Sequence, residues 1–127
     1  MNTHARIHWL RILLGGFLAE VSVIAVVIPV SLLFGKQAVP YAALLASLLS
    51  CFLFALWVGR RIDSRFVLHG ILVGLVATLL YVGLTLGRPE PLAYLVAHGL
   101  KILGGAAGGF VASRRRTAIG AATSAVQ

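Results

Sequence analysis

The sequence contains very little charge, and almost none of it is negative. Only 11% of the 127 residues are charged, with three acidic residues against eleven lysines and arginines. Soluble proteins carry about 25% charged residues, whereas 60% of this chain is hydrophobic and its mean hydropathy is +1.00. Because a soluble fold of this length could not bury so much apolar surface, the sequence predicts a protein embedded in lipid.

Cysteine and the usual catalytic motifs are also scarce or missing. Cys51 is the single cysteine, which excludes an intramolecular disulfide and a metal site built from several cysteines. The sequence has no P-loop, no G-x-S-x-G, no H-E-x-x-H, no C-x-x-C and no paired carboxylates. We therefore expect a protein that is not an enzyme and that holds neither a metal nor a cofactor.

The positive charge lies in short clusters between apolar runs. The net charge of +8 would suit nucleic acid only if the basic residues covered a folded, water-facing surface. Clusters that flank apolar runs instead suit anionic lipid head groups, so we expect lipid contacts and no nucleic-acid binding. The arginines assigned to these contacts are Arg60, Arg61, Arg65, Arg114, Arg115 and Arg116.

Four apolar runs are long enough to cross a membrane as helices. A hydrocarbon core about 30 Å thick needs roughly 20 helical residues, and the runs cover about residues 9–34, 41–59, 66–87 and 92–113. Short linkers force antiparallel neighbours. The sequence thus predicts an all-α membrane protein, a four-transmembrane-helix bundle with up-down-up-down topology. Residues 1–116 form its single domain, and 117–127, small and polar, are expected to be a disordered tail.

The distribution of arginine and lysine predicts the orientation. Eight arginines lie before the first span, between the second and third, and after the fourth, whereas the other two linkers hold only Lys36 and Arg88. By the positive-inside rule, both termini are then cytoplasmic in a multi-pass protein of a bacterial-type inner membrane.

The two hairpins resemble each other weakly. Aligning Arg11 with Arg65 also aligns Gly16 with Gly70, and Arg60 with Arg114. This pattern fits either a parallel 2+2 hairpin repeat or the likeness of any two hairpins with basic ends.

Ionisable residues inside the spans are the candidate polar site. Glu20 lies about 12 Å and Lys101 about 19 Å from the arginine-bearing side at 1.5 Å rise per residue, with His98 farther toward the opposite side. Such residues are costly in lipid and mark functional sites. Direct contact between Glu20 and Lys101 would favour mutual neutralisation, whereas separate positions on a shared cavity would favour transport. His69, one turn from Arg65, is expected to reach the membrane interface.

Glycines on the fourth span predict close helix packing. They are Gly99, Gly104, Gly105, Gly108 and Gly109, and they include two overlapping GxxxG motifs. Such glycines let two helix backbones approach closely, so this face, with Tyr94, His98 and Lys101, should meet protein. The partner helix could belong to this chain or to another subunit.

Two functions fit these features. The sequence favours the first, a structural or accessory subunit within a homo-oligomer or a larger membrane complex, because catalytic motifs are missing and the fourth span has a glycine face. The second is a small proton-coupled transporter centred on Glu20. The stretch Leu14-Gly15-Gly16-Phe17-Leu18-Ala19-Glu20 resembles the first helix of the small multidrug resistance exporters. That resemblance implies a shared proton and cation site at Glu20, although Lys101 has no counterpart in that family.

Overall fold

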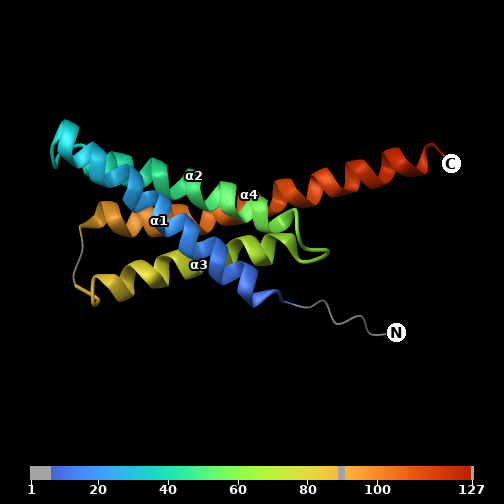
Figure 1. Ribbon diagram of the computed structural model, residues 1–127, viewed down its shortest axis with the longest axis horizontal. Coiled ribbons are helices and arrows are strands. Elements are labelled where there is room, and N and C mark those ends of the chain that lie inside the picture. Colours follow the sequence, from blue (N-terminus) through green and yellow to red (C-terminus); the bar gives the residue numbers. More distant parts are fainter. Residues whose placement is uncertain (1–6, 89–90, 127) are drawn as a thin grey trace.

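The computed structural model describes residues 7–88 and 91–126, and all of their regular structure is helical. The helices are α1 (Trp9–Phe34), α2 (Val39–Gly59), α3 (Phe66–Leu84) and α4 (Leu92–Ser124). Each is long and apolar enough to cross a membrane. In Figure 1, α1 begins and α4 ends on the same side of the bundle. The predicted fold class, an all-α bundle of four candidate membrane spans, is confirmed.

Left-handed backbone positions set several helix boundaries. Gly35 (φ 79°) ends α1, and Arg65 (φ 53°) stands immediately before α3. After α3, Leu86 and Gly87 have φ values of 54° and 66°. Glycine adopts this conformation at little cost. The third span therefore ends at Leu84 and does not continue to residue 87 as the hydropathy suggested.

The helices do not all contact one another. Within the described chain, α4 packs on α2 and α3, and α1 packs on the same two helices, but α1 does not approach α4. Figure 1 shows α1 crossing the bundle obliquely. A space between α1 and α4 is therefore available to side chains.

Small residues lie inside the bundle and large apolar residues lie outside. Buried positions include Ala19, Ala77 and Ser47, whereas Leu32, Phe34 and Leu45 are exposed. A soluble protein would place the large apolar side chains inside. This reversed arrangement is the one expected of helices that pack through small residues in lipid.

The carboxyl-terminal part of α4 corrects one prediction. Residues 117–124, expected to be disordered, continue the helix as far as Ser124, and their side chains are exposed. The segment contains no proline and several alanines, and lengthening an existing helix adds one hydrogen bond per residue without a new nucleus. In Figure 1 this part of α4 extends beyond the bundle.

Candidate functional site

Glu20 and Lys101 form a buried ion pair between α1 and α4. Lys101 Nζ donates a hydrogen bond to Glu20 Oε2 at 2.6 Å. Both residues are 2% exposed. The pair connects the two helices whose backbones do not meet. The two side chains are therefore in direct contact, which favours mutual neutralisation of their charges.

The positions of the two residues along the bundle axis differ from the sequence estimate, which placed Lys101 farther than Glu20 from the arginine-bearing side. A Cβ atom on Gly16 would meet Val76, and one on Gly74 would overlap the Lys101 carbonyl oxygen. The Lys101 backbone is thus level with Gly16, one turn before Glu20. Side chains lean toward the amino-terminus of their helix, so in antiparallel α1 and α4 these two lean toward each other. The estimate counted the depth of Glu20 from the first turn of α1 and that of Lys101 from Arg114. It failed because these two starting points do not lie at the same level.

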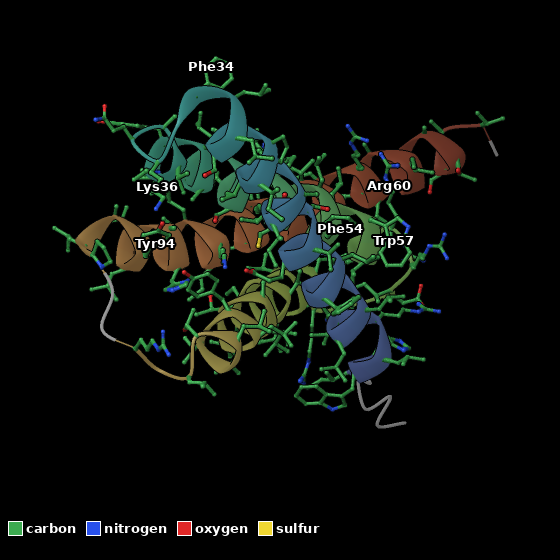
Figure 2. The ribbon with its side chains drawn as sticks, turned by 60° about the vertical axis from the view of Figure 1, so that its left-hand side comes forward. Phe34, Lys36, Phe54, Trp57, Arg60 and Tyr94 are labelled. Carbon is green, nitrogen blue, oxygen red and sulfur yellow. The ribbon has the colours of Figure 1, made fainter. Side chains whose placement is uncertain are left out.

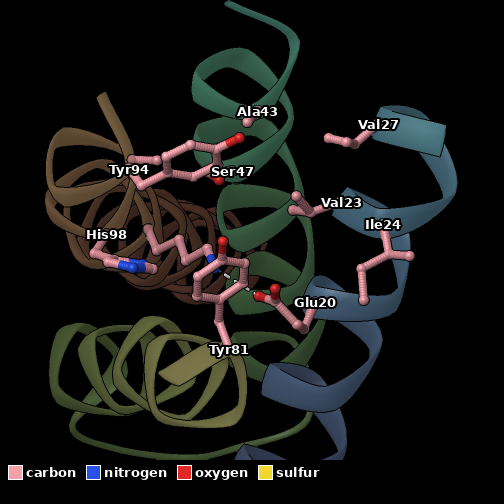
Figure 3. A pocket seen from close by; sticks show the side chains of 11 residues that line it. Glu20, Val23, Ile24, Val27, Ala43, Ser47, Tyr81, Tyr94 and His98 are labelled. Atoms are coloured by element: carbon pink, nitrogen blue, oxygen red, sulfur yellow. Dashed lines mark hydrogen bonds and ion pairs between the residues drawn. The ribbon is translucent and has the colours of Figure 1, made fainter. Parts of the chain in front are cut away.

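The same two residues also line a cavity, but they do so in direct contact and not at the separate positions that would have favoured transport. The cavity has a volume of about 150 Å³ and lies between α1 and α4. Its walls are Glu20, Val23, Ile24, Val27, Ala43, Ser47, Tyr81, Tyr94, Ala97, His98 and Lys101. Figure 3 shows Tyr81, Tyr94 and His98 across this space from Val23, Ile24 and Val27. The structure thus combines the pair with a shared cavity.

Aromatic side chains surround the ammonium group. Lys101 Nζ lies 4.9 Å from the centroid of the Tyr81 ring, a cation–π distance. The Tyr81 ring stacks on Tyr94, with centroids 6.3 Å apart, and lies 5.0 Å from the His98 ring. Tyr81 and Ser47 were not among the predicted site residues. Tyr81 is near the end of its span, where a tyrosine is usually an interfacial anchor, so no sequence pattern indicated that it lies beside Lys101.

The second carboxylate oxygen of Glu20 has no partner. Glu20 Oε1 is buried and accepts no hydrogen bond from the residues that the structure describes. A buried charged oxygen without a donor is unfavourable. This atom is therefore the place in the site where a proton or a donor group would be stabilised.

A second cavity extends the first toward one end of the bundle. It has a volume of about 400 Å³, shares Val27 and Tyr94 with the first, and reaches Lys36 in the turn between α1 and α2. Lys36 is exposed. Figure 2 shows Lys36 and Tyr94 toward one end and Trp57 and Arg60 toward the other. The two cavities therefore adjoin each other along the direction from the ion pair to the Lys36 end.

Apolar packing closes the bundle toward its arginine-rich end. Ile12, Val58, Ile62 and Val73 form a cluster in which every member is at most 1% exposed. Ile62 belongs to the loop that joins α2 and α3, and Ile12, Val58 and Val73 pack with it from α1, α2 and α3. No residue of this cluster lines either of the two cavities, which lie on the Lys36 side of it.

Hydrogen bonds at the same end connect the start of α1 to the loop between α2 and α3 and to the start of α3. The Arg11 guanidinium donates to the Arg61 carbonyl oxygen. His69 was expected to reach the interface but is 1% exposed. Its Nε2 accepts the His8 N–H at 3.3 Å, so Nδ1 carries the proton and donates to the Arg65 carbonyl oxygen at 2.9 Å. The imidazole is buried because it satisfies backbone groups of two segments.

The arginines assigned to lipid are exposed, but they are not equivalent. Arg116 forms an ion pair with Asp63 at 2.5 Å and also donates to the Ile62 carbonyl oxygen. Arg61 lies over the Trp57 ring and Arg114 over the Phe110 ring. Arg60, Arg65 and Arg115 are exposed as well. Arg116 thus joins α4 to the α2–α3 loop, a role that the lipid assignment did not include.

Four of the five predicted glycines contact neighbouring helices of this chain. A Cβ atom on Gly104 or Gly108 would overlap a backbone oxygen of α2, and one on Gly105 or Gly109 would overlap one of α3. Gly99 differs, because it is exposed and its Cβ position has nothing within 4 Å. Two residues correspond to about 200° around a helix, which turns Gly99 away from Lys101.

Metal-binding groups do not gather in the part of the chain that the structure describes, where no three His, Cys, Asp or Glu residues could hold an ion. Cys51, a free and buried thiol, lies on α2 within electrostatic reach of Glu20 and Lys101.

No known protein family, curated protein or solved structure matches this chain. The likeness of residues 14–20 to the small multidrug resistance exporters remains a local resemblance.

Proposed function

We propose that this small multi-pass membrane protein is a proton-coupled transporter whose solute binds in the cavity beside Glu20 and Lys101. One observation carries the proposal: a buried ion pair lines a cavity that adjoins a second cavity at the Lys36 end, while a packed apolar cluster occupies the arginine-rich end of the bundle. Transporters place their sites near the membrane midplane with access from one side at a time. Glu20 is the proton carrier, since its Oε1 has no donor.

The glycine face of α4 also supports transport over assembly. The sequence left open whether these glycines meet another subunit. Gly104 and Gly108 contact α2, and Gly105 and Gly109 contact α3, so the face is occupied within one chain. The main sequence feature that suggested a subunit interface therefore has an internal explanation.

A structural or accessory subunit is the second candidate. It is favoured by the direct 2.6 Å contact between Lys101 Nζ and Glu20 Oε2, because two charges that neutralise each other need no further role. This function implies a larger complex. Extraction in mild detergent followed by size analysis separates the candidates, since an accessory subunit co-purifies with other chains, whereas a transporter forms a particle of this chain alone.

The arginine distribution supports a location in a bacterial-type inner membrane with both termini in the cytoplasm. In that orientation the cavity opens outward past Lys36. The exposed Arg60, Arg65 and Arg115 then contact anionic head groups of the cytoplasmic leaflet.

Proton flux in proteoliposomes tests the proposed transport. Vesicles that contain the protein and the internal pH dye pyranine receive a gradient of methanesulfonate, tetramethylammonium or glycine betaine, which represent small anions, cations and zwitterions. We expect at least one gradient to change the internal pH with wild-type protein. Protein-free vesicles and the Glu20→Gln variant should show no such change. Equal responses of wild type and Glu20→Gln, or no response to any of the three, would refute the proposal.

A further inference from the structure

We infer that the transported solute is a small organic monoanion, which binds Lys101 when Glu20 takes up one proton. This inference rests on the proposed function and specifies its substrate class. The observation behind it is the composition of the site: one carboxylate, one ammonium group and an adjoining outer cavity lined by a second lysine, Lys36.

Charge balance in the cavity restricts what can bind. The pair is neutral as it stands, and an uncompensated charge buried in a low-dielectric site is strongly unfavourable. Protonation of Glu20 removes the negative partner and leaves the Lys101 ammonium uncompensated. A monoanion beside Lys101 restores neutrality, so the empty site and the site that holds one proton and one monoanion are both neutral.

The surroundings of Glu20 offer no other fixed charge that would change this balance. The titratable groups facing it from neighbouring helices of the described chain are Lys101, His98 and Tyr94 on α4, Tyr81 on α3 and Cys51 on α2. Lys101 supplies the only ammonium group among them. Lys101 is therefore the group that a bound anion would contact.

Lys101 is also placed to receive an anion without a large rearrangement. Its ammonium lies between Glu20 Oε2, at 2.6 Å, and the face of Tyr81, 4.9 Å from the ring centroid. An ammonium group has three N–H donors, so releasing the carboxylate frees one of them toward the cavity. The hydroxyl groups of Ser47 and Tyr94 line the same space and can donate hydrogen bonds to an anion.

The mouth of the outer cavity, at Lys36, favours anions over cations. Lys36 is the only charged residue lining the outer cavity, and Glu20 is the only acidic residue lining either cavity, as far as the described residues show. A positive charge at the mouth raises the local concentration of anions and lowers that of cations. This differs from the cation site that the resemblance to multidrug exporters implied, and the difference comes from Lys101 and Lys36.

The volume and the lining residues of the inner cavity indicate the size and polarity of the anion. Cavities of about 150 Å³ hold a guest of about the size of benzene. The inner cavity has this volume, and Val23, Ile24 and Val27 form its apolar side. A small carboxylate or sulfonate with a short apolar group fits both the cationic and the apolar walls.

Thermal unfolding of the purified protein in detergent tests the inference without any transport step. Two probes of similar size and opposite permanent charge are compared: sodium methanesulfonate and tetramethylammonium gluconate, with gluconate, too large for the cavity, as the balancing anion. A ligand that binds only the folded state raises the Tm. We expect methanesulfonate to raise the Tm and tetramethylammonium to leave it unchanged.

The pH dependence of methanesulfonate binding, compared between wild type and variants of the pair, assigns the binding to Glu20 and Lys101. In wild type the apparent Kd for methanesulfonate should weaken by about tenfold for each pH unit once Glu20 loses its proton, because one proton accompanies binding. In Glu20→Gln, which imitates the protonated carboxyl, the Kd should not depend on pH. Lys101→Met should not bind the anion, and Arg88→Gln, altered at an exposed residue that lines neither cavity, should keep the wild-type pH dependence.

Several outcomes would overturn the inference. They are stabilisation by tetramethylammonium alone, methanesulfonate binding by Lys101→Met, or a wild-type Kd that does not change with pH. If Glu20→Gln does not fold, the wild-type pH dependence and Lys101→Met decide. Proton flux driven by tetramethylammonium in vesicles would uphold transport and refute the anion. Binding of methanesulfonate without any flux would uphold the anion site and refute transport.

Discussion

Glu20 and Lys101 are individually unfavourable in this protein and acceptable only together. Each residue is 2% exposed, and the backbones of α1 and α4 do not approach each other. Removing one partner from a buried pair leaves a charge without compensation, which costs about 3–5 kcal/mol, whereas replacing both with apolar or neutral groups of similar size is often neutral or stabilising. The stability of the bundle should therefore depend on both residues as a unit.

A double-mutant cycle measures this dependence. Glu20→Gln and Lys101→Met should each lower the free energy of unfolding in detergent micelles by about 3–5 kcal/mol. The double variant should recover most of that loss, because it buries no net charge. Denaturant titration of the four proteins at one pH provides the values. Additive losses would contradict the direct contact between the two side chains.

At the residue scale, the sequence identified the charges of the site but not its other walls. Glu20 and Lys101 were recognisable because ionisable residues inside apolar runs are rare. Their contact was not predictable, since their relative height depends on how α1 and α4 cross α3. Ser47 and Tyr81 were not identified, because a serine in a span and a tyrosine near its end have ordinary structural explanations.

At the scale of the element, α4 packs through two adjacent rows of glycine. Gly104 and Gly108 meet the backbone of α2, while Gly105 and Gly109 meet that of α3. The approach is closest where Gly105 faces Gly70, because a Cβ atom on either would overlap the carbonyl oxygen of the other. Two helices can thus lie against α4 at once, and this close packing positions Lys101, one turn before Gly105.

Gly105→Leu should be far more damaging than the same change on the other side of α4. Overpacking costs about 1–3 kcal/mol where neighbours can adjust, and here the neighbour is backbone, so we expect a loss at the upper end of that range or larger. Gly99→Leu is the matched control: its Cβ position is open, and leucine favours the helix over glycine by up to about 1 kcal/mol.

Thermal unfolding in one detergent compares these variants. Leu103→Ala, which shortens a side chain that is 63% exposed, should also have a small effect. Equal losses for Gly105→Leu and Gly99→Leu, or a larger loss for Leu103→Ala, would show that the glycine rows do not face the neighbouring helices.

The helix boundaries show how far hydropathy alone predicts the elements of this protein. Hydropathy located all four spans, because length and apolar content are strong signals in a membrane protein. It placed the end of α3 too late and missed residues 117–124 of α4. The first error arose from the left-handed turn at Leu86 and Gly87, and the second from reading low hydropathy as disorder. Neither backbone conformation nor helix extension is encoded in hydropathy.

At the scale of the whole molecule, the two ends of the bundle differ. The arginine-rich end is closed by the cluster of Ile12, Val58, Ile62 and Val73, and the other end holds the cavities and Lys36. This polarity makes the orientation in the membrane important, because it determines which compartment reaches the site. The possible duplication of the two hairpins stays an interpretation of the sequence alone.

Cysteine labelling should establish the orientation. In a Cys51→Ser background, Gln37→Cys should react with an impermeant thiol reagent applied to intact cells, whereas Gly120→Cys should react only after permeabilisation. Both positions are exposed, so accessibility of the side chain does not limit either reaction. Labelling of Gly120→Cys in intact cells together with protection of Gln37→Cys would reverse the orientation and direct the cavity toward the cytoplasm.

The most direct test of the central claim is solute-driven proton flux in vesicles containing the Glu20→Gln/Lys101→Met double variant. This variant keeps the site neutral, so its thermal unfolding, measured on the same preparation, should stay close to that of wild type. If the pair is the transport site, the double variant is folded and its flux falls to that of protein-free vesicles under a gradient that drives the wild type. If the folded double variant moves protons at the wild-type rate, the pair only stabilises the bundle and the transport account is contradicted.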